Sequence, residues 1–182
     1  MYNIAVNPAQ GLYTKTQFKR GDIPTPGTTG IVHDADGGGI TKEFISVKFT
    51  ATANRLNGSL VTIDHDGVAT LGTVAEGGLL ISGKRAGILT YNASAVATQT
   101  MTGTHFGWAQ IYGKGKALVT GTATISIVGM ALESIAGGAV DEGAVGSASA
   151  NLYGLNATVA STYPPGLMDV FINYPRYQNI SG

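Results

Sequence analysis

Alternation of apolar and polar residues with a period of two is the dominant pattern along this chain. In FISVKFTAT (residues 44–52), isoleucine, valine, phenylalanine and alanine alternate with serine, lysine and threonine, which predicts a strand with one buried face. LMDVFINY (residues 167–174) alternates in the same way. Apolar runs between glycines predict further short strands, namely GGLLIS, AGILTY, FGWAQIYG, KALVTG and TATISIVGMAL. No segment keeps the 3.6-residue period of an amphipathic helix, so we expect an all-β protein.

Turn signals between these runs predict how the strands are joined. Asn57-Gly58 precedes SLVTI and Asp66-Gly67 precedes VATLGTV, and both residues of such pairs tolerate the positive φ of a tight hairpin turn. Two such turns in succession predict a β-meander. Residues from about 136 to 166 are mostly Gly, Ala, Ser and Asn and predict long loops. The expected fold is an antiparallel β-barrel or β-sandwich with long Gly/Ala-rich loops.

The first 30 residues differ from the rest, because prolines and glycines interrupt them and no strand pattern is sustained. We interpret residues 1–30 as an extended N-terminal arm, which is either a solvated loop or strand or a segment that lies on another subunit. Its basic side chains are Lys15, Lys19 and Arg20. Residues 31–182 are expected to form a single β-rich domain, and a subdivision would fall near residue 100.

The composition indicates a surface that is covered by other protein. Among 182 residues, 43% are hydrophobic, only 12% are charged and 27 are glycine, so the charged share is about half the usual one. Eleven basic and eleven acidic residues cancel, which argues against nucleic-acid binding. The absence of cysteine excludes disulfides and thiolate metal sites. Neither a signal peptide nor a membrane-length apolar run is present, so we expect a soluble protein synthesised in a cytoplasm.

One stretch, GLLISGKR (residues 78–85), fits the first seven positions of the phosphate-loop pattern G-x-x-x-x-G-K-[ST]. In a phosphate loop the x positions form a glycine-rich turn that opens a helix, whose N–H groups face the phosphates. Here they are Leu, Leu, Ile and Ser, Arg85 replaces the magnesium-binding hydroxyl, and AGILTY predicts a strand. We interpret the match as a strand ending in a Gly-Lys turn, and no cofactor is expected.

Two Asp-x-Asp-Gly stretches, DADG (34–37) and DHDG (64–67), hint at calcium. Neither supplies the oxygen ligand at the fifth position nor the acid at the twelfth position that a calcium loop needs. Asp-Gly turns are the ordinary interpretation of both stretches. His33, Asp34 and Asp36 form a candidate site for an adventitious ion. No catalytic metal is expected.

The remaining titratable groups do not form a catalytic pattern. No His-x-Glu, His-x-x-x-His or Gly-x-Ser-x-Gly arrangement surrounds His33, His65 or His105. Carboxylates paired for glycosidase chemistry would be visible only in space, and the chain has few acids. We therefore expect a protein that is not an enzyme.

The segment FGWAQIYGKGKALVTGTATISIVGMAL (residues 106–132) resembles the capsid decoration (cement) proteins of tailed bacteriophages. In that family a Gly-Trp-x-Gln-x-Tyr-Gly strand precedes a short turn and an Ala-Leu-Val-x-Gly strand. The matching positions here are Gly107, Trp108, Gln110, Tyr112, Gly113, Ala117, Leu118, Val119 and Gly121. A later Gly-x-Ala-Leu segment matches either 129–132 or 145–148, and MDVFI supplies the closing strand. The resemblance covers about the last 75 residues, and the insertion at 149–166 departs from shorter members.

This resemblance implies a structural virion protein on the outer surface of the phage head, synthesised in the host cytoplasm. It would bind the assembled shell, commonly as a homotrimer, and bridge neighbouring copies of the major capsid protein; no nucleic acid or membrane takes part. Stabilisation would follow from binding only the assembled state, strengthened by multivalency. The alternatives are a tail-fibre or receptor-binding β-module, which predicts an exposed aromatic cluster for carbohydrate, and a small β-barrel hydrolase or lyase.

Eight residues are the candidates for capsid or subunit contacts. They are Lys15, Lys19, Arg20, Trp108, Tyr112, Tyr174, Arg176 and Tyr177. The three basic residues of the arm would meet an acidic capsid surface, and the last three residues form an aromatic and basic tail. Trp108 and Tyr112 fall on one strand face; core positions are the ordinary interpretation, and an interface anchor is the alternative.

Overall fold

The computed structural model describes residues 26–27, 29–33, 41–50, 53–71, 85–89, 98–101, 103–119, 128–130, 132–142, 152–154 and 166–174. Across these ranges the chain is all-β, as expected, with a single 3₁₀ turn, η3 (Ala136–Gly138), as its helical element. The strands are β1 (Thr29–His33), β2 (Thr41–Phe49), β3 (Ala53–Leu56), β4 (Leu60–Ile63), β5 (Ala69–Leu71), β6 (Arg85–Leu89), β7 (Thr98–Met101), β8 (His105–Val119), β9 (Leu132–Ser134), β10 (Val140–Glu142), β11 (Leu152–Gly154) and β12 (Gly166–Asn173). Within the described ranges, no helix has the length and apolar character needed to span a bilayer.

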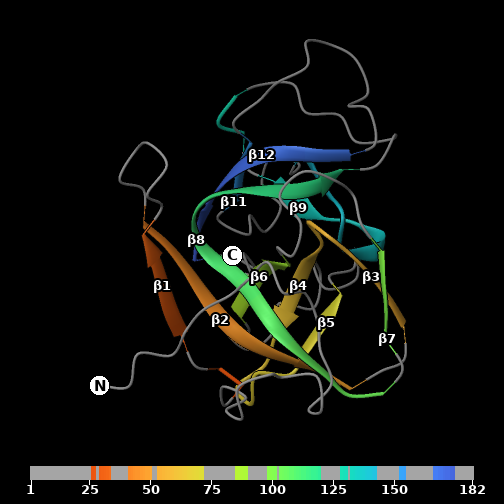
Figure 1. Cartoon of the computed structure of the whole chain (residues 1–182). Helices are drawn as coiled ribbons and strands as arrows, with labels where there is room; N and C mark the ends of the chain where they lie inside the picture. The colour runs from red at the N-terminus through yellow and green to blue at the C-terminus, as the bar shows by residue number, and fades with distance from the viewer. Residues whose placement is uncertain are drawn as a thin grey trace, which may run out of the picture.

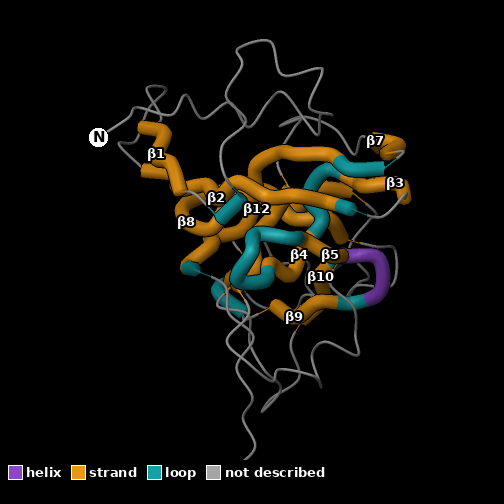
Figure 2. Tube along the Cα trace, turned by 90° about the horizontal axis from the view of Figure 1, so that it is seen from below, coloured by secondary structure: helices purple, strands orange, loops and turns teal. Residues whose placement is uncertain are grey.

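One large sheet contains ten of the described strands, and β3 pairs with β7 in a second, two-stranded sheet. The main path runs β1-β2-β8-β6-β4-β5, and β12, β11, β10 and β9 extend from β8. The described ladders are antiparallel except for one parallel pairing between β10 and β8. Figures 1 and 2 show β1 at one side of the molecule and the β3–β7 pair at the other. Strands from both sides of residue 100 therefore share one sheet.

Strand β8 is the centre of this sheet and changes partners along its length. Its first part pairs with β2 up to Tyr112, and its second part pairs with β12 from Tyr112 to Val119. In Figure 1 the strand curves from a course beside β2 to a course beside β12. The pattern predicted two strands, FGWAQIYG and KALVTG, separated by glycines. The correction is that both belong to a single 15-residue strand that bends.

Glycine makes the bend of β8 sterically feasible. Gly113 has a φ of +94°, and a Cβ added there would lie 2.6 Å from the carbonyl oxygen of Thr41 on β2. The β2–β8 register also shifts between Glu43 and Phe44, which is the sign of a bulge. Bulges bend a strand and strengthen its twist. A side chain at position 113 would prevent this close approach.

The bend brings β8 into two separate hydrophobic cores. Ala109 and Ile111 pack in a core with apolar residues of β2, β4, β5 and β6. Beyond the bend, Ala117 and Val119 pack in a second core with residues of β4, β6, β9, β10 and β12. Strand β4 is buried at all four positions, because successive side chains point to opposite faces and each face meets one core.

The main sheet curls, and it does not close into a barrel. The first core lies inside the curl between β2 and β5, and one bridge between Lys48 and Val68 links β2 to the loop before β5. No ladder between β2 and β5 is formed in the described ranges. Of the two expected architectures, the sandwich is therefore the one that remains compatible with the described strands.

The prediction of a hairpin at Asn57-Gly58 is wrong, although the turn itself forms. Gly58 has a φ of +84°, but β3 continues into the small sheet with β7 and β4 pairs with β5 and β6. The turn is instead anchored on distant strands, since Gly58 N–H donates to Leu89 O and Gly58 O accepts from Leu118 N–H, both at 2.8 Å. A local turn signal cannot report these long-range partners.

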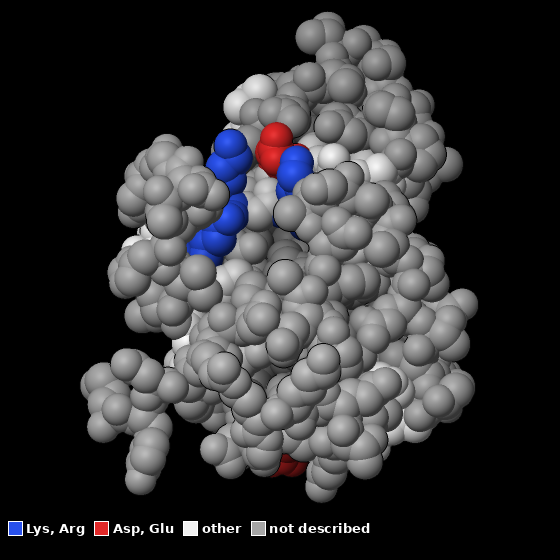
Figure 3. Space-filling model, in the orientation of Figure 1, with Lys and Arg blue, Asp and Glu red and all other residues white. Residues whose placement is uncertain are grey.

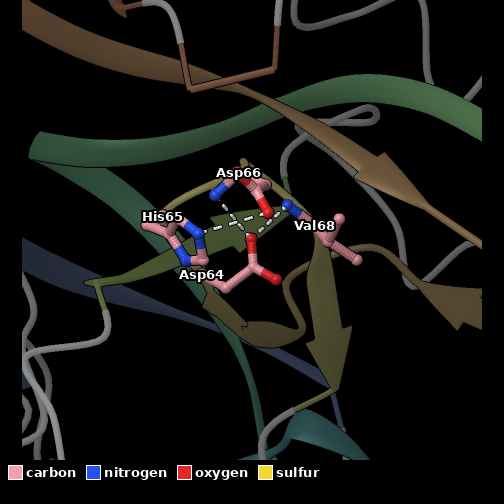
Figure 4. A network of polar contacts seen from close by, with 4 residues as sticks. All are labelled: Asp64, His65, Asp66 and Val68. Atoms are coloured by element: carbon pink, nitrogen blue, oxygen red, sulfur yellow. Dashed lines mark hydrogen bonds and ion pairs between the residues drawn. The ribbon is translucent and has the colours of Figure 1, made fainter.

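The second turn, at Asp66-Gly67, does form the expected β4–β5 hairpin. The Asp64 carboxylate accepts hydrogen bonds from the backbone N–H of Asp66 at 2.9 Å and of Val68 at 2.8 Å (Figure 4). Such Asx turns are the ordinary reason for aspartate before a tight turn. The interpretation of DHDG as a turn is confirmed.

The structure of residues 136–166 differs in part from the long loops that the sequence predicts there. Within that range η3, β10 and β11 form regular structure, and β11 pairs with β12. These elements are only three residues long, too short for a periodic pattern to identify. The closing strand β12 is confirmed, with Met168, Val170 and Ile172 fully buried.

Candidate interface at the bend of strand β8

An aromatic cluster lies on the outer face of the sheet where β8 bends. Beyond the bend, alternation places Tyr112, Lys114 and Lys116 on one face of β8. The antiparallel register sets Phe171 opposite Lys114 on β12. The Tyr112 ring packs edge-on against Phe171, with centroids 5.8 Å apart, and stacks on Tyr174 at 5.1 Å.

Tyr174 closes this cluster through an unusual backbone conformation. Its φ is +47°, and it is the one non-glycine residue with positive φ in the described ranges. Its N–H donates to Ile111 O at 2.7 Å, and its side chain hydrogen-bonds Glu43, which raises the pKa of the tyrosine together with desolvation and the negative charge of Glu43. The residue is 41% exposed. Contacts from β2 and β8 thus hold a partly exposed ring in place.

Gln110 supports the bend from the interior. Its side-chain amide donates to Tyr112 O at 3.0 Å and to Lys114 O at 3.1 Å, and the residue is 2% exposed. A Cβ on Gly115 would lie 2.8 Å from the Gln110 side-chain oxygen, so the amide fits closely against the bent backbone. The two carbonyls belong to Tyr112 and Lys114, so Gln110 holds the backbone on both sides of Gly113 in its bent course.

Charged side chains flank the aromatic cluster. Lys116 forms an ion pair with Asp169 at 2.8 Å, directly across the ladder, with both side chains partly exposed. Lys114 is exposed, and no ion pair to it is formed within the described part of the chain. The Lys42 side chain lies against the bend, 3.3 Å from where a Cβ of Gly113 would be. Figure 3 shows basic side chains gathered around an acidic group on this face.

We call this surface the β8 patch. It consists of Glu43, Tyr112, Lys114, Lys116, Asp169, Phe171 and Tyr174. The patch combines aromatic area with fixed positive and negative groups on a supported strand. Such a combination suits recognition of a protein surface, in which aromatic anchors supply much of the binding energy.

The eight candidate contact residues fall into three groups. Tyr112 and Tyr174, 62 positions apart in the sequence, are stacked on each other in the β8 patch. Trp108 is only 6% exposed, in agreement with the core interpretation, and its role in an interface stays a prediction. The remaining five lie outside the described residues: Lys15, Lys19, Arg20, Arg176 and Tyr177.

Sequence reasoning missed the partners of these tyrosines. Phe171 and Asp169 are polar-face positions of the alternating segment 167–174, and Lys114 and Lys116 alternate with two glycines after Tyr112. Reading the outward positions of both segments together would have indicated the patch, but only once the two strands were known to pair. The register that joins them is a tertiary property.

The phosphate-loop and metal-site patterns in the sequence gain no support from the described residues. Arg85 begins strand β6, where a phosphate loop would begin a helix, and residues 78–84 lie outside the described ranges. Among the residues the structure describes, no group of three potential metal ligands comes together. Asp34 and Asp36 lie outside these ranges, as does the His33 side chain.

Comparison with known proteins gives no match among family models, curated proteins or solved structures.

Proposed function

We propose that this chain is a structural virion protein that binds the outer surface of an assembled phage head and bridges neighbouring major capsid subunits. The proposal starts from the resemblance of residues 106–132 to capsid decoration proteins. The described parts of that segment are strand β8 from Phe106 onward, residues 128–130 and Leu132 at the start of β9. Three of its motif positions have linked roles there, since Gly113 permits the bend, Gln110 supports it and Tyr112 stands on its outer face.

The β8 patch is the observation that carries the proposal. Its aromatic rings and lysines lie on the partly exposed face of the β8–β12 ladder, and surfaces that combine aromatic and charged groups in this way suit protein partners. A protein that binds only the assembled shell stabilises that shell by mass action. If it binds as a homotrimer, three linked contacts of modest strength would add to a far tighter attachment. No chemical step is required.

A second candidate, a tail-fibre or receptor-binding module, is favoured by one feature of the same surface. Tyr112, Phe171 and Tyr174 form a partly exposed aromatic cluster, and stacked aromatic rings are also a platform for sugar rings. The lysines beside them are better suited to an acidic protein surface than to a neutral glycan. We therefore place the head-binding role first.

Quantitative mass spectrometry of purified particles tests the proposal directly. We expect a copy number comparable with that of the major shell protein. A few copies per particle would instead place the chain in the tail or a fibre. Complete absence from particles would overturn both structural roles.

A further inference from the structure

We propose that the β8 patch docks on a carboxylate-bearing surface of the shell protein, with Lys114 as the main electrostatic contact. This inference rests on the proposed function and adds the chemistry of the partner surface to it.

Charge is the first reason for assigning an acidic partner. The lysines of the patch are Lys114 and Lys116, and the ion pair with Asp169 already occupies Lys116. Lys114 is exposed, and within the described residues its ammonium group has no ion pair. It stands opposite Phe171 in the ladder, so a carboxylate that meets it would lie beside apolar area. Partial burial there strengthens an ion pair relative to a fully solvated one.

Spacing is the second reason, because it defines what the partner must present. Lys114 and Phe171 stand directly opposite each other in the ladder, where Cβ atoms are about 4.5–5.5 Å apart. The partner must therefore present one carboxylate with an apolar group at about that distance from it. The Tyr112 and Tyr174 rings, stacked at 5.1 Å, would contact apolar groups next to that carboxylate.

Rigidity is the third reason. Gln110 holds the carbonyls of Tyr112 and Lys114. Tyr174 is held by its backbone hydrogen bond to Ile111 O and by its stack on Tyr112. A surface whose backbone and rings are already fixed loses little conformational entropy on binding. The patch is therefore arranged for docking before the partner arrives.

The test is co-sedimentation of the purified full-length protein with expanded heads that lack it, across a range of salt concentrations. Lys114→Glu reverses the central charge. Lys48→Glu is the matched control, because Lys48 is a partly buried lysine of the same sheet that pairs opposite Phe106, six residues and roughly 20 Å from Tyr112 along β8. Thermal melts establish that both variants are folded.

We expect Lys114→Glu to weaken head binding by at least roughly 10-fold at low salt and Lys48→Glu to leave it unchanged. The difference between Lys114→Glu and the wild type should shrink as salt screens the contact. Equal binding of Lys114→Glu and the wild type would overturn this inference and leave the proposed function standing. Failure of the wild type to bind heads would overturn both.

One further measurement tests whether a second copy of the chain, and not the shell protein, occupies the patch. Size-exclusion chromatography with light scattering measures the oligomeric state of each variant without heads. A change in that state for Lys114→Glu would assign the patch to contacts between copies of the chain and would overturn docking on the shell. An unchanged state with weakened head binding supports the inference.

Discussion

Replacing Gly113 by alanine should destabilise the protein in two distinguishable ways. The first is conformational, since a φ of +94° costs a non-glycine residue about 1–2 kcal/mol. The second is steric, because the new Cβ would lie 2.6 Å from Thr41 O, whereas ordinary contacts begin near 3.4 Å. Strands β2 and β8 would have to separate by about 0.8 Å, a strain of the kind that costs about 1–3 kcal/mol. We expect a total loss of about 2–5 kcal/mol in the free energy of unfolding.

Comparison with Gly103→Ala separates the steric part of this loss from the conformational part. Gly103 has a φ of +82°, and a Cβ there would meet nothing within 4 Å, so its cost should be conformational alone, about 1–2 kcal/mol. Urea unfolding followed by fluorescence measures both variants, because Trp108 is the single tryptophan and is buried on β8. Equal destabilisation of the two variants would refute the close approach of β8 to β2 at the bend.

Three further predictions address the groups around the bend. Gln110→Leu keeps the volume but removes the amide that donates to two carbonyls, so the free energy of unfolding should fall by about 1–3 kcal/mol in the same assay; an unchanged value would contradict the supporting role of the amide. The raised pKa of Tyr174 means that its stabilising contribution is complete below pH 10 and is lost as the pH rises through the folded-state pKa. The fall in stability above pH 10 should therefore be smaller in Tyr174→Phe, and identical pH profiles would exclude the contact with Glu43. A double-mutant cycle on Lys116 and Asp169 should give a coupling of about 0.2–1 kcal/mol that decreases in high salt, and a salt-independent value would contradict an exposed ion pair.

Alternation in the sequence was sufficient to predict the all-β class. The single solvated face expected for residues 44–52 is wrong, because β2 is buried at all four positions from Phe44 to Val47, the polar Ser46 included, so both of its faces are covered there. Strand β12 agrees with the prediction, since its buried and partly exposed positions follow the period of two. Tyr174 continues that alternation and would be expected inside, yet it is 41% exposed. The strand ends at Asn173, and the positive φ of Tyr174 turns its side chain onto Tyr112 instead.

Longer-range features could not be predicted because local patterns do not encode them. Asn57-Gly58 makes the turn its residues favour, but hydrogen bonds to β6 and β8 decide where the next strand goes. The glycines at 113 and 115 resembled a break between strands, whereas the chain uses them to bend one strand against Thr41 and Gln110. The candidate site could not be predicted from local patterns for the same reason, since Tyr112 and Phe171 meet only through the register of β8 with β12.

The bend of β8 couples the stability of the chain to the geometry of its candidate interface. On either side of it the same strand enters different cores, through Ile111 on one side and Ala117 on the other, and between them it presents Tyr112 and Lys114 outward. Loosening the bend should therefore reduce stability and head binding together, whereas reversing the charge of Lys114 should reduce binding alone. Head binding that survives Gly113→Ala unchanged while stability falls would show that the patch does not depend on the bend.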